Sequence, residues 1–148
     1  MDEGAEAGRA RLRVIKPEDM SSDTAQTPGM LRSEAISGTS CRSGALWMGE
    51  TRMAPATRSA NHHHGHSETG IFVASGHPVF VVSDGSGGET RFATSPGDYV
   101  FVPPFVPHRE ENPSADSDAV ATAPAATPSA PWITTAAVGA TRTRKQVL

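Results

Sequence analysis

A chain of 148 residues is the size of one domain with extensions, and its composition narrows the classes of function. Hydrophobic residues make up 36% of the chain and aromatic residues only 5%, so part of the chain is expected to lie outside the core. The net charge is −3 and the 13 Lys and Arg residues are scattered, which excludes the basic surface that binds nucleic acid or anionic membranes. The expected partner is a small molecule, with no nucleic acid and no membrane.

The single cysteine, Cys41, excludes an intrachain disulfide and a cysteine-rich zinc module, and it favours a reducing compartment. The first residues, MDEGAEAGRA, are polar and lack the apolar stretch of a secretory signal, and no run of 18 apolar residues follows. These observations predict a cytoplasmic protein.

Residues 1–30 are expected to form an irregular arm, because their apolar residues are confined to one short patch and the segment SSDTAQTPGM is rich in turn formers. From Ala45 the segment ALWMGETRMAP alternates between apolar and polar residues, which predicts a first core strand that Pro55 ends.

Two apolar runs follow, ETGIFVASG and HPVFVVSDGSGG, and the simplest interpretation is two strands joined as a hairpin. ETRFATSPGD then carries a turn at 96–98, and a strand at Tyr99–Val102 is interrupted by Pro103 and Pro104. No stretch has a helical period. Short strands separated by glycine and proline predict an all-β sandwich or small barrel over residues 31–118.

Residues 119–148 are rich in Ala, Thr and Pro, and no acidic residue follows Asp118. This composition predicts a low-complexity tail. A closing strand at 132–138 is possible, although three prolines lie within 124–131 and large side chains are scarce.

A histidine cluster is the strongest chemical signal in the sequence. His62, His64 and Glu68 have the same parity, so an extended strand would point them to one face, and Gly65 would allow the backbone to bend. Imidazole nitrogens with one carboxylate oxygen suit a divalent transition metal such as Fe, Mn, Ni, Zn or Cu. His108, after a proline-rich segment, would supply a third imidazole if a barrel brought distant strands together.

Other interpretations of the same residues stay open. The histidine run would also fit a solvated loop that binds metal adventitiously, and Glu68 would also fit a solvated carboxylate at a strand edge. His108 taken alone would be an ordinary surface or core histidine.

Two spacings resemble the motifs of a known family. His62-x-His64-x3-Glu68 with Gly76 is similar to the first cupin motif, and Gly97-x5-Pro103-x4-His108-x3-Asn112 is similar to the second. The resemblance covers roughly residues 13–118, and it is to small single-domain bacterial cupins of the type-2 class, in the RmlC-like superfamily. It implies a cupin-type double-stranded β-helix, or jelly-roll, barrel that is often dimeric, with a metal held by His62, His64, Glu68 and His108.

The sequence departs from the family pattern at three positions and in its tail. Ala56 stands where a glycine usually opens the first motif, Gly76 comes one residue late, and Phe105 replaces a glycine inside the second motif, which should narrow or redirect the turn before His108. The tail lacks the apolar strands that usually close the barrel, so a barrel edge is expected to be poorly covered.

An octahedral ion with four protein ligands keeps two neighbouring positions for substrate, water or dioxygen. We therefore expect a metal-dependent enzyme, most simply a dioxygenase; decarboxylation, isomerisation, a non-catalytic binding module and a degenerate barrel are the alternatives. The resemblance also implies a homodimer. Candidates for the apolar pocket wall, about half of which must face outward, are Phe72, Phe80, Val82, Tyr99 and Phe101. Tyr99 would serve either as a proton donor or as a structural hydroxyl.

Overall fold

The computed structural model describes residues 12–126, which form an all-β protein of nine strands with two short helical turns. Residues 1–11 of the predicted arm and the predicted closing strand at 132–138 lie outside the described residues. In chain order the elements are η1 (Pro17–Asp19), β1 (Leu31–Ile36), α2 (Gly38–Cys41), β2 (Leu46–Met53), β3 (Thr57–Arg58), β4 (Glu68–Ser75), β5 (Val79–Ser83), β6 (Glu89–Ala93), β7 (Tyr99–Val102), β8 (His108–Asn112) and β9 (Ala119–Ala126).

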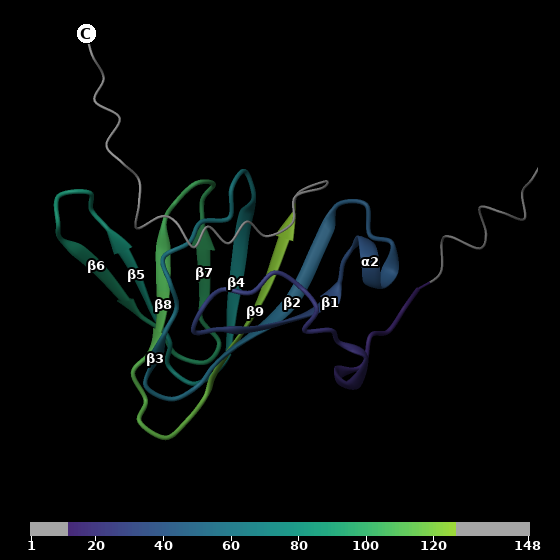
Figure 1. The fold of residues 1–148 in the computed structure, drawn as a ribbon, viewed down its shortest axis with the longest axis horizontal. Coiled ribbons are helices and arrows are strands. Elements are labelled where there is room, and N and C mark those ends of the chain that lie inside the picture. Colours follow the sequence, from purple (N-terminus) through teal and green to yellow (C-terminus); the bar gives the residue numbers. More distant parts are fainter. Residues whose placement is uncertain (1–11, 127–148) are drawn as a thin grey trace, which may run out of the picture.

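The strands make two sheets, with the orders β1-β2-β9-β4-β7 and β3-β8-β5-β6. Every strand pairing is antiparallel. Figure 1 shows the five-stranded sheet beside the smaller sheet of β3, β8, β5 and β6. The predicted all-β class and jelly-roll arrangement are therefore confirmed.

The chain crosses from one sheet to the other between β4 and β5, so the predicted hairpin of these two strands is wrong. β4 pairs with β7 and β9, whereas β5 pairs with β6 and β8. The crossing begins at Gly76, whose φ is +75° and where a Cβ would lie 2.8 Å from the Asp118 carbonyl oxygen. Only glycine fits this turn, because both the backbone angle and the space exclude a side chain.

The predicted strands at β2 and β7 are confirmed, and their side chains alternate between the two faces. The core lies between the sheets and contains one cluster of buried apolar residues: Ile71, Phe80, Val102 and Ala123, with Val100, Val106 and Ala121 packed against them. The described side chains thus bury a modest core, as the low hydrophobic content predicts.

β9 occupies the first eight residues of the segment predicted as a tail, so the structure differs from that expectation at its start. It lies between β2 and β4 and pairs with both along most of its length. A strand with two neighbours has its backbone hydrogen bonds satisfied on both edges, and small side chains are enough where the sheets approach closely. Val120 and Ala123 are buried there. The barrel therefore continues past residue 118.

The described part of the N-terminal arm is irregular apart from η1 and runs along β1. Ser21 forms an isolated bridge with Glu34. Gln26 holds both main-chain groups of Arg32, since its Oε1 accepts from the Arg32 amide and its Nε2 donates to the Arg32 carbonyl oxygen, each at 2.8 Å. The arm is therefore attached to the barrel by backbone-directed hydrogen bonds.

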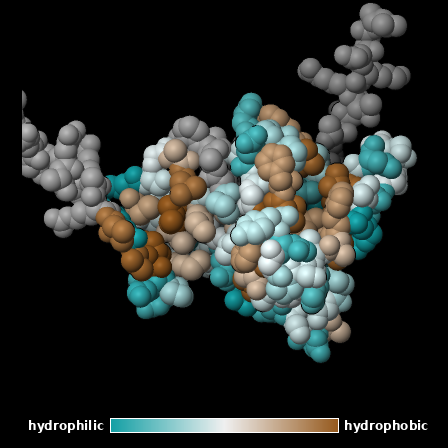
Figure 2. Space-filling view, turned by 180° about the vertical axis from the view of Figure 1, so that it is seen from behind, coloured by the Kyte–Doolittle hydropathy of each residue, from teal (hydrophilic) through white to brown (hydrophobic). Residues whose placement is uncertain are grey.

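The surface is mixed in character. Figure 2 shows apolar side chains in separate patches among polar ones on the face opposite that of Figure 1. The large hydrophobic residues that are exposed include Phe92, Tyr99 and Phe101. No helix among residues 12–126 is long and apolar enough to cross a membrane.

Ala56 lies in the left-handed region, with φ of 53°, at the position where the family pattern has glycine. A residue with a Cβ costs roughly 1–2 kcal/mol there, while glycine loses about 0.5–1 kcal/mol through the entropy of the unfolded chain. We expect Ala56→Gly to raise the free energy of unfolding by about 0.5–1 kcal/mol in urea denaturation. The matched control is Ala54→Gly, which is also exposed but has no positive φ and should destabilise the protein; stabilisation by both variants would contradict the explanation.

Candidate metal centre

Three histidines meet between the sheets, as the sequence predicts. His62 and His108 form an isolated β-bridge in which each amide donates to the other's carbonyl oxygen at 2.9 Å. His64 follows two residues later on the same face. The three side chains are 1%, 6% and 2% exposed in the order His62, His64 and His108, and one ligand nitrogen from each lies within 4.8 Å of the others. The described fold therefore presents a buried imidazole triad.

The hydrogen bonds of the triad fix which nitrogen of each ring faces inward. Nδ1 of His62 donates to the carbonyl oxygen of Ala60, and Nδ1 of His108 donates to that of Val106, each at 3.0 Å. A carbonyl oxygen only accepts, so a neutral ring must carry its proton on Nδ1 and present the lone pair of Nε2. Nδ1 of His64 lies 2.8 Å from Thr69 Oγ1.

Two of the inward-facing nitrogens are orphaned. Nε2 of His62 and Nε2 of His108 are buried and have no hydrogen-bond partner within residues 12–126. Buried polar atoms are nearly always satisfied, so each exception needs an explanation. Metal-binding histidines show this same arrangement, with one ring nitrogen bound to an outer acceptor and the other directed at the ion. The triad therefore fits a divalent transition metal.

Glu110 is a functional residue that the sequence interpretation missed. It is 5% exposed, its Oε2 lies 3.5 Å from Nε2 of His62, and its Oε1 lies 3.4 Å from Nε2 of His108. Ser59 orients it, because Ser59 Oγ donates to Oε2 at 3.1 Å and accepts from the Glu110 amide at 3.0 Å. The alternation of β8 was the available signal, since residues two apart share a face and His108, Glu110 and Asn112 are all buried.

Glu68 is exposed at the start of β4, and the structure does not bring it into the cluster of ligand atoms. The chain turns tightly between His64 and β4: Gly65 has φ of +59°, and the Ser67 amide donates to the His64 carbonyl oxygen at 3.1 Å. This turn breaks the parity that a continuous strand would keep. Thr69, with no exposed surface, takes the inward position beside His64. A ligand role for Glu68 stays a prediction.

Burial and charge set the protonation of the site. Burial lowers the pKa of His64 to about 2 and also lowers that of His62. Burial alone would raise the pKa of Glu110, but the neighbouring His62 and His108 hold it at about 2. Burial likewise opposes a charge on His108, yet the adjacent Glu110 carboxylate raises the pKa of this ring. His62 and His64 are thus neutral, as metal ligands must be, and Glu110 is ionised.

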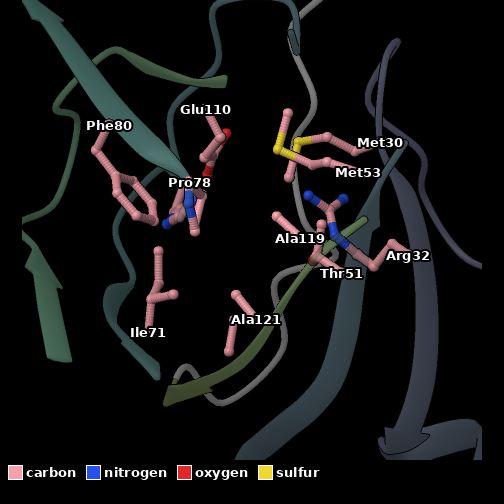
Figure 3. A pocket seen from close by; sticks show the side chains of 12 residues that line it. Met30, Arg32, Thr51, Met53, Ile71, Pro78, Phe80, Glu110, Ala119 and Ala121 are labelled. Atoms are coloured by element: carbon pink, nitrogen blue, oxygen red, sulfur yellow. The ribbon is translucent and has the colours of Figure 1, made fainter. Parts of the chain in front are cut away.

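Two cavities flank the triad. The smaller, of about 30 Å³, is drawn in Figure 3 and is lined by Arg32, His64 and Glu110 together with apolar side chains. The larger, of about 520 Å³, reaches His108 and is lined mostly by apolar residues of β5 to β7. A volume of this order is typical of small-molecule sites.

The residues predicted for the pocket wall divide between the interior and the surface. Phe80 is buried and lines both cavities, and Val82 lines the larger one. Tyr99 and Phe101 also border the larger cavity, but they are 80% and 63% exposed and so belong to its rim. The Phe72 ring packs against the Tyr99 ring at 5.0 Å.

Phe105, which stands where the family pattern has a glycine, has a left-handed backbone with φ of 59°, and its amide donates to the Gly65 carbonyl oxygen at 2.9 Å. The half-exposed ring contacts His66 and His63, with ring centres 4.6 and 5.9 Å apart. These two histidines lie outside the triad.

Two antiparallel sheets that enclose a histidine triad define a small jelly-roll barrel with a candidate metal centre. The family model described as "Cupin domain" matches residues 49–123, and the chain belongs to this family. A search of curated proteins found no match to the sequence.

Similar solved structures agree on the fold. The polyketide cyclase RemF from Streptomyces resistomycificus has a TM-score of 0.65 at 16% identity, over 84% of this chain and 87% of that one. An uncharacterized protein with a double-stranded β-helix domain from Klebsiella pneumoniae has 0.59 at 17%, over 81% and 94%. An oxalate oxidase in complex with glycolate has 0.64 at 17%, over 85% and 64%. At these identities the likeness shows the fold alone.

Proposed function

We propose that the protein binds one divalent transition metal, Fe, Mn, Ni, Zn or Cu, through His62, His64 and His108, with Glu110 as the fourth ligand, and acts on a small molecule at this centre. The observation that carries the proposal is the pair of buried, partnerless Nε2 atoms beside an ionised carboxylate. Such a cluster is costly to bury without a cation, because the two Nε2 atoms have been removed from water with no hydrogen bond and lie beside a buried carboxylate.

The protein's own residues would keep the ligands in place. Ala60 and Val106 orient two imidazoles through their carbonyl oxygens, Thr69 orients the third, and Ser59 orients the carboxylate. These outer contacts fix the tautomers and the ring planes before an ion arrives. A bound metal of this kind supplies Lewis-acid or one-electron chemistry at its open positions.

A dioxygenase-like reaction is the simplest form of this proposal. The similar structures include a polyketide cyclase, an oxalate decarboxylase and oxalate oxidases, so the shared fold serves several reactions. Isomerase or decarboxylase chemistry, or binding without catalysis, are the competing outcomes. The identity of the metal that the protein retains on purification would favour one of these reactions over the others.

The test is elemental analysis of the untagged protein, purified without added metal and then exposed to each of the five candidate ions. Glu110→Gln preserves shape but removes the ligand charge, so near-stoichiometric metal in the wild type should fall sharply in this variant. Glu68→Gln is the matched control and should retain the wild-type content. Loss of metal in Glu68→Gln alone would restore Glu68 as the fourth ligand, and a wild type that takes up no ion would refute the metal centre.

We also propose a cytoplasmic homodimer. The resemblance to small cupins supports the dimer, and the lone Cys41 supports a reducing compartment. Light scattering coupled to size-exclusion chromatography checks the first point, because a monomeric mass would contradict it. Fractionation of the source cells checks the second.

A further inference from the structure

Arg32 of β1 places a guanidinium group inside the barrel. It is 3% exposed, its Nη1 donates to the Ala25 carbonyl oxygen at 2.8 Å, and its Nη2 donates to Thr27 Oγ1 at 3.4 Å. Gln26 bonds both main-chain groups of the same residue. The arm therefore fixes both the backbone and the charged end of Arg32, which is how a binding group is preorganised.

The fixed guanidinium and the metal ligands share the smaller cavity. Arg32, His64 and Glu110 all line it, and in Figure 3 Arg32 points into the space from one wall while Glu110 and Phe80 lie across it. Its volume of about 30 Å³ leaves room for roughly two water-sized groups. The two oxygens of a single carboxylate need about this much space.

The cavity has a positively charged group in its wall. Glu110 is the one buried carboxylate among residues 12–126, Arg32 is buried and lines the same cavity, and a bound divalent ion would add positive charge. A guanidinium fork matches the geometry of a carboxylate, and burial strengthens their attraction. An anion is therefore the ligand that this cavity stabilises.

We propose that the smaller cavity binds the carboxylate group of a small substrate, with Arg32 as the residue that recognises it beside the metal centre. This inference rests on the proposed metal site and narrows its substrate class to small carboxylates. The rest of the lining is largely apolar, including Ile71, Met53 and Phe80, so it discriminates against a larger polar group.

The experiment uses the full-length protein loaded with Co²⁺, whose visible absorption reports exchange at the metal, with the Co²⁺ content measured for every sample. Acetate should change the spectrum saturably, whereas acetamide, which has the same shape without the charge, should not. Arg32→Met should retain Co²⁺ and bind acetate about tenfold more weakly or worse. Arg58→Met, an exposed arginine of β3, is the matched control and should behave like the wild type.

The outcomes separate the two proposals. Equal acetate affinity in wild type and Arg32→Met, both loaded with Co²⁺, would overturn the role of Arg32 and leave the metal centre intact, as would equal binding of acetamide. A wild type that takes up no Co²⁺ would overturn both. If Arg32→Met does not fold, Arg32→Lys replaces it, because a lysine keeps the charge but lacks the fork and should also weaken acetate binding.

Discussion

Replacement of His108 by alanine is expected to lower the affinity for a divalent transition metal by at least about 100-fold. Loss of an outer contact to a ligand already costs 10–100-fold, and His108 supplies a ligand atom itself. The change also leaves the buried Glu110 carboxylate without the imidazole of His108, whose Nε2 lies 3.4 Å from Oε1 in the native site. The measurement is the dissociation constant for Zn²⁺ by competition with a chromophoric chelator.

His63→Ala is the control for that experiment. His63 neighbours two members of the triad in sequence, but its ring faces Phe105 and its Nδ1 accepts from the Gly65 amide. Its removal should leave the dissociation constant unchanged. If both variants bound Zn²⁺ with equal affinity, the assignment of the triad as ligands would be wrong. Circular dichroism of the metal-free His108→Ala protein shows whether the barrel is retained.

Asn112→Ala is expected to destabilise the fold by about 3–5 kcal/mol, the largest effect on stability that we predict. Asn112 is 2% exposed, and its Nδ2 donates to the carbonyl oxygens of Met53, Ala54 and Ser117 at 2.8–3.1 Å. Its Oδ1 accepts from the Ser114 amide at 3.2 Å. One side chain thus joins the end of β2 to the loop between β8 and β9, and alanine would remove all four hydrogen bonds, including the buried one to Met53.

Urea denaturation of the metal-free protein measures this change. Asn61→Ala is the control, because Asn61 is exposed, and it should alter the free energy of unfolding by less than about 0.5 kcal/mol. A loss below about 1 kcal/mol in Asn112→Ala would show that water replaces the missing donor.

Much of the architecture and the imidazole triad could be predicted from the sequence. Two sequence features predicted β2 and β7: the alternation of apolar and polar residues, and the prolines that follow each strand. The alternation is visible because a strand at a barrel surface keeps a period of two. The spacing of two motifs placed His62, His64 and His108 at one site, which the structure confirms. These features depend on local pattern and on the resemblance, both of which are visible in the chain.

The carboxylate beside the triad was not identified from the sequence, because its position depends on backbone geometry that a linear pattern does not encode. The parity argument for Glu68 assumed a continuous strand, but the chain turns at Gly65, and Thr69 rather than Glu68 is buried beside His64. Glu110 was overlooked because a carboxylate on a strand usually faces solvent, although the alternation of β8 puts it on the same face as His108.

The start of the predicted low-complexity tail also differs from the structure, because residues 119–126 form β9. Composition cannot distinguish a low-complexity segment from a strand of small residues, because the two differ only in whether neighbouring strands satisfy the backbone. β9 has such a neighbour on each side, in β2 and β4.

The position of β9 also bears on how the protein folds during synthesis. The five-stranded sheet places the last described strand between two earlier ones, so that Leu46 faces Ala126 and Glu68 faces the same residue from the other side. When synthesis has passed β8 but not β9, this sheet consists of two separate halves, β1-β2 and β4-β7. The edges of β2 and β4 are then unpaired and open to pairing with other nascent chains. Completion waits for residues 119–126, and pairing over such long sequence separations is slow.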